Sequence, residues 1–469
     1  MSPERTLTAL LALASPAAAQ LTNDPFPDPI GGGRAPIVVD YTEFAQVPGV
    51  GDQAPRMTLL VPESGTRRMF VNDMNGPIHS ISYDGRAVTL YVDTNDPRWG
   101  YAIQSGGNER GLQSFAFHPQ FGQVGTAGAG KFYTWVDILG TAPTPDFRPG
   151  PDSRDSHDTV LLEWTARNPS AARYDGGPPR ELLRLEQPYS NHNAGQLGFN
   201  PTALPGDADY GLLYVGVADG GSGGDPMGMS QDLGSAFGKV FRIDPLGSSS
   251  VNGKYGIPAD NPFAGDDNPN TLAEIYVYGV RNPQRFGWDS QNGNLFLADI
   301  GQNTVEELSL VTPGANLGWN VWEGSFRFIG REGVDLANPR GDRAVTYPVA
   351  EYGQPDPLLQ SQSAATGVHV YRANAVPRIA NMVLWGDNPS GEVWAISADD
   401  IPNGGQAPIR RVLLNDRGTP KTLLQLIRER NAQQARGPAG RADLRLGSGP
   451  EGQAVLLNKQ DGVVRMLVP

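Results

Sequence analysis

The stretch FGWDSQNGNLFLAD, Phe286–Asp299, decides the fold that this sequence predicts. At both of its ends apolar residues alternate with small or polar ones, as they do in half-buried strands. The Asp, Ser, Gln, Asn and Gly residues between the two ends favour a turn. The pattern therefore predicts two antiparallel strands joined by a short loop.

The same hairpin pattern recurs along the chain at intervals of about 80 residues, which is typical of repeat architectures. Six copies favour an all-β, six-bladed β-propeller with four-stranded antiparallel blades and long loops on one face. Val464–Val468 would close the ring beside an N-terminal strand, whereas two stacked β-sandwich domains are the alternative architecture. The other five copies lie at 68–81, 115–137, 197–219, 367–386 and 444–457.

Composition excludes several classes of protein. The chain has 469 residues with 59 Gly and 41 Pro, which interrupt helices and central strands, so a mostly helical fold is excluded. A formal net charge of -13 disfavours nucleic acid and anionic membranes as partners. The absence of Cys from the sequence rules out thiolate catalysis, iron–sulfur clusters and Cys-based zinc sites. Redox chemistry in such a chain needs a bound organic cofactor.

The N-terminus has the pattern of an export signal. Arg5 precedes an apolar run from Leu7 to Ala14, and Ala17–Ala19 supplies the small residues of a cleavage site. The run is too short to span a bilayer, so we expect no membrane insertion after cleavage. We predict a signal peptide at 1–19, an N-terminal extension at 20–56, the propeller at 57–469, and a periplasmic or secreted location. A disordered N-terminal tail is the alternative.

One segment has the pattern of a helix. Thr419 could cap it, Pro420 could occupy its first position, and Leu423–Ile427 supplies an apolar stripe. We expect this helix to serve as a lid or brace rather than as a separate domain.

The chain contains only five histidines as candidates for a general base near neutral pH. His118 lies in a turn, His79 and His369 lie within strands, and His157 lies in an Asp-rich loop that is expected to be solvated. His192 differs, because it sits in a cluster of small and amide residues just before a strand. A turn histidine bonded to its neighbour is the alternative there.

Other motifs are less specific. The Gly-rich run Asp219–Asp225 lacks the Lys-Ser/Thr of a phosphate loop, so nucleotide binding is rejected. Asp299, Glu306 and Glu307 offer hard oxygen ligands that suit calcium better than zinc. A solvated acidic turn is the alternative for these three residues.

Six motifs together resemble the glucose/sorbosone dehydrogenase family, which includes soluble aldose dehydrogenases that use pyrroloquinoline quinone and the propeller of Hedgehog-interacting proteins. The resemblance runs from about Thr58 to the C-terminus. In chain order the motifs are Asn108–Leu112, Phe115–Pro119, Asn191–Leu197, Gly238–Ile243, Tyr278–Gln284 and Asn316–Asn320.

The resemblance implies a six-bladed propeller that binds the quinone at the mouth of its channel through calcium. His192 would take the proton of an anomeric hydroxyl while hydride passes to the quinone. Arg281 and Asn282 match residues that contact the quinone, and the Arg can stabilise its reduced oxygen. Glu109 stands where the family often has Gln beside the sugar, and Asn191 adjoins the histidine.

The resemblance also implies two calcium sites. Gly301 and Gln302 match carbonyls that hold the cofactor calcium. Glu306 and Glu307, with the carbonyl of Leu317, match a structural calcium site.

The chain departs from the family pattern at three points. Asn191 replaces the Asp expected to support the histidine, so His192 would lose a carboxylate that fixes its tautomer. The Lys expected near Pro389–Gly391 is missing. Instead of an Arg-x-Arg pair, Arg441 and Arg445 stand before and at the start of the last hairpin, where they are candidates for cofactor binding.

We therefore expect an exported enzyme that oxidises the anomeric carbon of aldoses, with pyrroloquinoline quinone and Ca²⁺ as cofactors and an external electron acceptor. A calcium-braced propeller that binds a glycan or protein partner is one alternative. A calcium-dependent lactonase or esterase, with His192 activating water, is the other.

Overall fold

The fold is taken from a computed structural model that describes residues 24–63, 65–140, 144–150, 157–193, 195–330, 333–359, 362–402 and 406–469. The expected signal peptide at 1–19 lies outside these described residues. In the described part of the chain, no helix is both long enough and apolar enough to cross a lipid bilayer.

The described residues form four antiparallel sheets of four strands each, and each sheet follows the order of its strands in the chain. The first two sheets contain β2 (Met57–Glu63), β3 (Arg68–Asp73), β4 (Pro77–Ser82) and β5 (Val88–Asp93), followed by β6 (Leu112–Phe117), β7 (Lys131–Ile138), β8 (His157–Thr165) and β9 (Arg180–Gln187). The next two contain β10 (Leu197–Phe199), β11 (Leu213–Val217), β12 (Lys239–Ile243) and β13 (Ile275–Tyr278), followed by β14 (Arg285–Trp288), β15 (Leu295–Asp299), β16 (Val305–Val311) and β20 (Ala350–Gly353).

A nine-stranded sheet joins the two ends of the chain. Its central strand β1 (Ile37–Gln46) pairs in parallel with β24 on one side and antiparallel with β28 on the other. β1 lies within the 20–56 stretch, so sheet structure begins before residue 57. The remaining strands are β21 (Ala365–Tyr371), β22 (Met382–Asp387), β23 (Val393–Ser397), β24 (Arg410–Asp416), β25 (Thr419–Lys421), β26 (Arg445–Ser448), β27 (Ala454–Leu457) and β28 (Val463–Val468).

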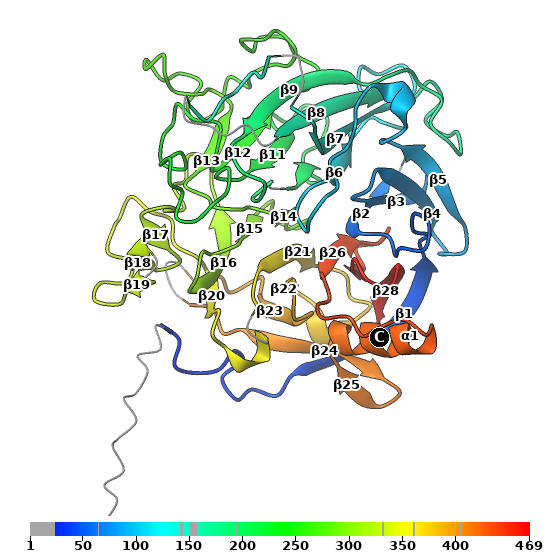
Figure 1. The fold of residues 1–469 in the computed structure, drawn as a ribbon, viewed down its shortest axis with the longest axis vertical. Helices are drawn as coiled ribbons and strands as arrows, with labels where there is room; N and C mark the ends of the chain where they lie inside the picture. The colour runs from blue at the N-terminus through cyan, green and yellow to red at the C-terminus, as the bar shows by residue number, and fades with distance from the viewer. Residues whose placement is uncertain are drawn as a thin grey trace, which may run out of the picture.

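The sheets are arranged around a common centre in a propeller-like ring, as Figure 1 shows. β2, β6, β14, β21 and β26 lie innermost in Figure 1. β6 contacts β2 and β10, β26 contacts β2 and β21, and β21 contacts β14. The ring closes where β28 pairs with β1, with Tyr41 opposite Leu467 and Thr42 opposite Met466. This pairing confirms the predicted closure of the last strand against an N-terminal strand.

Smaller elements decorate the ring. A three-stranded sheet of β17 (Trp322–Glu323), β18 (Phe326–Phe328) and β19 (Val334–Asp335) is inserted between β16 and β20. Short 3-10 helices lie at η1 (Pro97–Trp99), η3 (Pro357–Leu359) and η4 (Pro377–Ile379). This inserted sheet brings Glu323 and Trp319 towards the candidate site described below.

The predicted helix exists, but its predicted start is wrong. α1 spans Leu423–Gln433 and is capped by Thr422, whose hydroxyl accepts from the N–H of Gln425 while the Gln425 side chain accepts from Thr422. Thr419 and Pro420 belong instead to β25, which pairs with β24. The reciprocal capping box between Thr422 and Gln425 sets the start of the helix, although Pro420 is typical of a first helical turn.

The predicted hairpins form, with one shift of position. The copies at 115–137, 197–219 and 286–299 are the first two strands of their sheets. The copies at 367–386 and 444–457 are the hairpins at the two edges of the nine-stranded sheet. The copy at 68–81 is instead the second hairpin of its sheet, β3 and β4, because β2 comes first. The alternating pattern identifies a hairpin but does not say which hairpin of a sheet it is.

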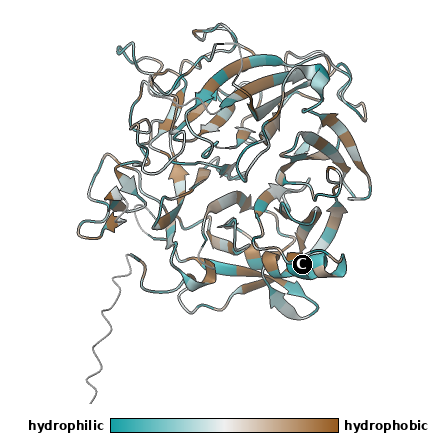
Figure 2. Cartoon of the chain, viewed as in Figure 1, coloured by the Kyte–Doolittle hydropathy of each residue, from teal (hydrophilic) through white to brown (hydrophobic). Residues whose placement is uncertain are grey.

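Figure 2 shows hydrophobic colouring concentrated along the strands, while the outer helix α1 is mostly hydrophilic. Large aromatic side chains fill the spaces between neighbouring sheets, and Trp135, Trp164, Trp385 and Trp394 are fully buried. The described residues therefore form the large core that the composition predicted without any disulfide.

Ring closure provides a test of stability. Leu467 in β28 is 1% exposed and packs among the buried residues of the nine-stranded sheet. Leu467→Ala removes buried methyl groups and leaves a cavity, so we expect it to lower the free energy of unfolding by about 2–5 kcal/mol. Denaturant titration measures the change. The matched control Val251→Ala lies at a fully exposed position and should change stability by less than about 0.5 kcal/mol.

Buried histidines predict a loss of stability in acid. Burial lowers the pKa of His369 to about 4, and its two ring nitrogens contact Ser448 Oγ at 3.0 Å and Gly452 O at 3.1 Å. Because the unfolded side chain binds its proton near pH 6.5, stability present above that pH is lost as the pH falls towards 4. Between pH 7 and pH 5, wild type should lose about 2 kcal/mol more than His369→Gln. Equal pH dependence of the two proteins in urea titrations would contradict this prediction.

Candidate functional site

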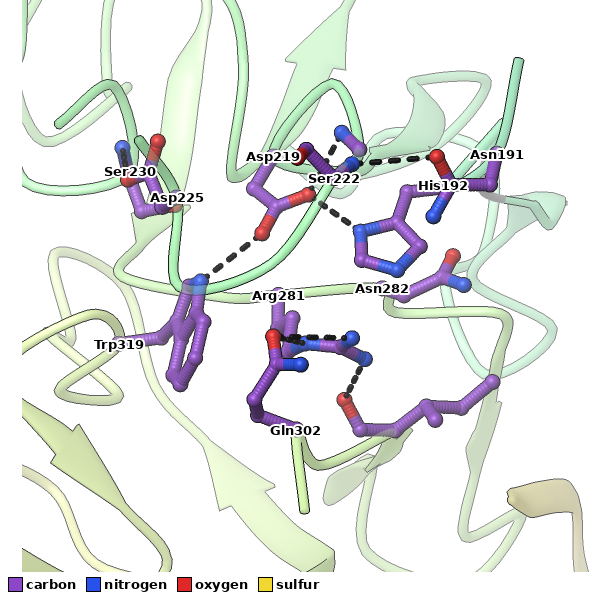
Figure 3. A network of polar contacts seen from close by, with 12 residues as sticks. Asn191, His192, Asp219, Ser222, Asp225, Ser230, Arg281, Asn282, Gln302 and Trp319 are labelled. Atoms are coloured by element: carbon purple, nitrogen blue, oxygen red, sulfur yellow. Dashed lines mark hydrogen bonds and ion pairs between the residues drawn. The ribbon is translucent and has the colours of Figure 1, made fainter. Parts of the chain in front are cut away.

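A buried His–Asp pair forms the centre of the candidate site (Figure 3). His192 Nδ1 lies 2.6 Å from Asp219 Oδ1, and the two side chains are 5% and 1% exposed. Because an ionised carboxylate can only accept, Nδ1 carries the proton and Nε2 is the acceptor of the neutral ring. In Figure 3 the Nε2 edge of the ring faces the side on which Asn282 lies. This arrangement is suited to a general base.

Asp219 is itself held by several donors. The indole Nε1 of Trp319 donates to its Oδ2 at 2.9 Å, and the N–H of Gly221 donates to its Oδ1 at 2.9 Å. Asp219 therefore supplies the carboxylate that the sequence comparison expected His192 to lack. The expectation that Asn191 deprives His192 of this support is wrong, since the support comes from a strand end 27 residues further along the chain.

The backbone of His192 is held in an unusual conformation. Its φ of 58° lies in the left-handed region, which residues other than Gly adopt uncommonly, although His does so more often than most. The N–H of His192 donates to Glu109 Oε2 at 2.7 Å, and the amide of Asn282 approaches the same oxygen at 3.5 Å. Glu109 thus connects the loop before β6 to both His192 and Asn282. Strained backbone of this kind is often found at functional sites.

Arg281 and Asn282 are fixed by a second carboxylate. The N–H of Arg281 donates to Asp299 Oδ2 at 2.8 Å, and the N–H of Asn282 donates to Asp299 Oδ1 at 2.7 Å. The guanidinium of Arg281 binds Ile300 O at 2.9 Å and lies 5.6 Å from the ring centre of Trp319. Burial raises the pKa of Asp299 to about 6, and the nearby Asp219 adds to this rise. The structure therefore brings His192, Arg281 and Asn282 together, as predicted.

Glu323 binds the backbone of the turn that follows β15. A single oxygen, Oε1, accepts the N–H groups of Gln302, Asn303, Thr304 and Val305 at 2.7–3.0 Å. In a planar trans peptide the carbonyl points opposite to the following N–H, so the carbonyls of Gly301 and Gln302 point away from Glu323. The Gln302 side chain turns towards Arg281, with Oε1 at 3.3 Å from Nε. These two carbonyls are the predicted ligands of a cofactor calcium.

The predicted structural calcium ligands have different surroundings. Glu306 accepts the N–H of Ala365 at 2.6 Å and the amide of Gln354 at 2.8 Å, and burial raises its pKa to about 8. Burial raises the pKa of Glu307 well above its usual range, with further contributions from Asp299, Glu351 and Glu323. Glu306 and Glu307 are neighbours in β16, where successive side chains point to opposite faces.

Leu317 is buried and its N–H binds Tyr278 O at 2.9 Å. Among the residues that the structure describes, no group of three or more His, Asp or Glu side chains is arranged to hold a metal ion. A calcium ion at this site would therefore need backbone carbonyls as well as carboxylates.

The remaining predicted residues lie around this centre. Asn191 Oδ1 accepts the N–H of Ser222 at 3.1 Å, so it ties the histidine loop to the Gly-rich run. Arg445 is 3% exposed and binds Gln284 Oε1 at 2.8 Å. Arg441 binds Asp443 at 2.5 Å and Asn388 at 3.0 Å. None of these contacts joins Arg441 or Arg445 to Arg281.

The prediction for His157 is wrong. It begins β8, is fully buried, and lies 2.7 Å from the amide of Asn193 and 3.5 Å from Asp137. β8 begins at His157 and carries its side chain into the core beside the His192 segment.

Sequence reasoning missed Asp219, Trp319 and Glu323, although one signal was available for Asp219. In several sheets an Asp stands at or near the end of a strand that follows the sheet's first strand, and four of these residues accept a backbone N–H from the segment that leads into that first strand. Asp219 ends the third copy but binds the His192 ring instead. The four N–H···Asp contacts are Arg56–Asp73 at 3.1 Å, Gly111–Asp137 at 2.9 Å, Arg281–Asp299 at 2.8 Å and Ala364–Asp387 at 2.9 Å.

Comparisons with known proteins agree with this fold. HIPL1 protein from Arabidopsis thaliana is 31% identical over 61% of this chain and 44% of its own length. Aldose sugar dehydrogenase YliI from Escherichia coli is 26% identical over 51% of this chain and 55% of its own. The chain spans about half the length of these relatives.

A solved structure supports the fold. The PQQ-bound aldose sugar dehydrogenase from Streptomyces coelicolor superposes with a TM-score of 0.55 at 20% identity, covering 92% of this chain and 98% of that one. The sequence model named glucose/sorbosone dehydrogenase matches residues 175–414, which include His192, Asp219, Arg281, Asn282 and Trp319. With more than half of its length matched by this model, the chain belongs to the glucose/sorbosone dehydrogenase family.

Proposed function

We propose that the protein is an aldose dehydrogenase that oxidises the anomeric carbon of a sugar with pyrroloquinoline quinone. The observation that carries this proposal is the buried His192–Asp219 pair, whose free ring edge faces Asn282 (Figure 3). Membership of the family and the two sugar dehydrogenases named above support a redox role over a purely structural one.

The site fits an anionic quinone. Arg281 supplies a guanidinium that can pair with the negative charge. Asn282 Oδ1 is buried without a hydrogen-bond partner among the described residues and, as an acceptor, would pair with a donor such as a ring N–H or a sugar hydroxyl. A buried unpaired oxygen costs free energy unless a ligand or water pairs with it. When bound, the quinone would accept the hydride of the anomeric carbon and so carry the two electrons.

The protein's own residues would handle the proton and the orientation. His192 Nε2 takes the proton of the anomeric hydroxyl, and Asp219 stabilises the resulting imidazolium through its 2.6 Å contact with Nδ1. Glu109 and Asn191 stand beside His192 and are the proposed sugar contacts. Arg281 stabilises negative charge that develops on the acceptor.

Calcium is the proposed metal cofactor. The carbonyls of Gly301 and Gln302 turn away from Glu323, and oxygen donors of this kind suit a hard cation. Glu323 Oε2 is buried without a hydrogen-bond partner among the described residues. A second calcium would be held by Glu307, which lies near Glu323 and Glu351, with the Leu317 carbonyl as the further proposed ligand. Glu306 points to the opposite face of β16 and would not share that ion.

We further propose that the ring has six blades and that the protein is exported. The nine-stranded sheet would divide at the parallel pairing of β1 with β24 into two four-stranded blades, β21–β24 and β26–β28 with β1. Export to the periplasm or medium rests on the signal pattern at 1–19.

One observation favours a second function, a calcium-braced binding module. The sequence has no Lys between Lys254 and Lys421, where the family pattern places a Lys that grips the quinone. A relative such as HIPL1 protein, whose name assigns no reaction, is compatible with this alternative.

The first test measures reduction of a dye acceptor by the chain reconstituted with pyrroloquinoline quinone and calcium, across a panel of aldoses. We expect aldose-dependent reduction that falls by about 10²–10⁴-fold in His192→Ala, because the general base is removed. The matched control is His118→Ala. It replaces a turn histidine whose Nδ1 accepts the N–H of Gln120 instead of contacting Asp219, so it should retain the rate. Reduction that does not depend on His192, or none with any aldose, would refute the proposal.

The second test separates orientation of the base from cofactor binding. In Asp219→Asn the side-chain amide cannot stabilise the imidazolium, so kcat should fall by about 10²–10⁴-fold. Quinone affinity, followed by cofactor absorbance, should remain within about threefold of wild type. A fall in affinity with kcat preserved would mean that Asp219 serves the cofactor rather than His192.

A further inference from the structure

The motif Gly238–Ile243 has no part in the proposed reaction, yet it contains a fully buried lysine. Lys239 begins β12 and is 0% exposed. Its Nζ donates to Phe237 O at 2.6 Å, Met229 O at 2.9 Å and Ser230 O at 3.0 Å. Three donated hydrogen bonds use all three N–H groups of a protonated amine, so Lys239 is present here as an ammonium ion.

The positive charge of Lys239 carries a free-energy cost. Burial lowers the pKa of Lys239 to about 7, although Asp225 and Asp232 oppose this shift. The three acceptors are neutral carbonyls, which pair the N–H groups but do not cancel the charge. An apolar side chain of similar length would avoid the cost, so the contribution of Lys239 lies in its hydrogen bonds.

The three carbonyls that bind Lys239 come from the two ends of one turn. Residues 229–237, which we call the 229–237 turn, lie between the Gly-rich run and β12, and the acceptors are the first two residues and the last. The turn approaches itself closely, because Gly238 has a φ of 69° and a Cβ there would lie 2.4 Å from Ser230 Oγ. The ammonium ion therefore joins both ends of the turn.

The 229–237 turn is bonded to the segment that carries Trp319. Gln231 follows Ser230 in the turn, and its Nε2 donates to Trp319 O at 2.6 Å and to Asn316 Oδ1 at 2.9 Å. Asn316 Nδ2 donates in return to Gln231 Oε1 at 2.9 Å. The side chain of Gln231 thus binds the backbone of Trp319 directly and through a neighbouring amide.

A second route leads from the same turn to Trp319. The carbonyl of Ser230, which accepts from Lys239, also accepts the N–H of Gly279 at 3.0 Å. The carbonyl of Gly279 accepts the N–H of Trp319 at 2.9 Å. The position of the Trp319 backbone therefore depends on where Lys239 holds residues 230 and 231.

Trp319 in turn binds the carboxylate of the His192–Asp219 pair. Its indole Nε1 donates to Asp219 Oδ2 at 2.9 Å, whereas His192 and Gly221 bind Oδ1. Figure 3 shows Trp319 on the side of Asp219 away from His192. The orientation of the Asp219 carboxylate, and with it that of the His192 ring, therefore depends on Trp319.

We propose that Lys239 is a positioning residue for the base of the candidate site. Its ammonium ion holds the 229–237 turn, the turn fixes Trp319, and Trp319 orients Asp219 against His192. The effect of Lys239 on turnover rests on the proposed function, whereas its effect on the contact between Asp219 and His192 does not.

The first measurement uses the protein without quinone. The proton that His192 Nδ1 shares with Asp219 in a short, charge-assisted hydrogen bond gives a far-downfield signal in a proton NMR spectrum, which is assigned by its loss in His192→Ala. Spectra are recorded at about pH 6, below the pKa of Lys239, so that its amine stays protonated. We expect Lys239→Met to shift or broaden this signal, because Trp319 no longer orients Asp219.

Lys131→Met is the matched control. Lys131 also begins a strand, β7, but its Nζ pairs with Glu163 at 2.9 Å. The His192 signal should be unchanged in this variant. The Tm of each variant verifies folding, and Gln231→Leu, at a half-buried position, supplies the same test if Lys239→Met does not fold.

The second measurement follows turnover with quinone, calcium and an aldose, and determines whether Lys239 acts through Gln231. Lys239→Met and Gln231→Leu should each lower kcat by about 10–10²-fold, with the KM for the aldose within about threefold of wild type. A misplaced base slows the reaction more than it weakens binding. The double variant should lose little more than the more damaging single variant, because both substitutions break one connected route.

Three outcomes decide the inference. A His192 signal that is unchanged in both Lys239→Met and Gln231→Leu would overturn it. Losses of kcat that add fully in the double variant would also overturn it, since Lys239 would then act by another route. A signal that moves in both variants, together with no dye reduction by wild type, would support the positioning role of Lys239 while refuting the proposed function.

Discussion

The structure depends on a carboxylate placed at the end of a strand. In four of the sheets an Asp at this position accepts a backbone N–H from the segment that enters the same sheet, which fixes where that sheet begins. Asp219 occupies the matching place in the third copy, but its oxygens bind His192, Trp319 and Gly221. The candidate site is thus built by redirecting an interaction that elsewhere only maintains the scaffold.

Neighbouring copies of this interaction support each other across the site. Asp299 fixes the backbone of Arg281 and Asn282, while the carbonyl of Arg281 accepts the N–H of Asp219 at 2.8 Å. The His192 segment is therefore connected to the Arg281 segment through two carboxylates and one backbone bond. A base and its facing donors held in this way need little reorganisation when a ligand arrives.

Local patterns predicted the hairpins, because alternation with a turn is a property of a short stretch of chain. They failed where two signals competed, as at Thr419 and Thr422, and where position within a sheet depended on a strand outside the repeat, as for β2. The resemblance selected His192, Arg281 and Asn282, and the structure brings them together. Asp219 escaped notice because its role depends on a contact between separate segments, which spacing along the chain does not encode.

The pairing of β1 with β28 has a consequence for the order of folding. β1 is the first strand of the described residues and β28 the last, so during synthesis the edges that they share remain open until β28 has been made. Exposed strand edges invite pairing with other chains, and contacts between residues so far apart form slowly. Before β1 and β28 pair, the incomplete ring can therefore aggregate through these edges and would benefit from a chaperone. Their pairing covers the edges and removes this risk.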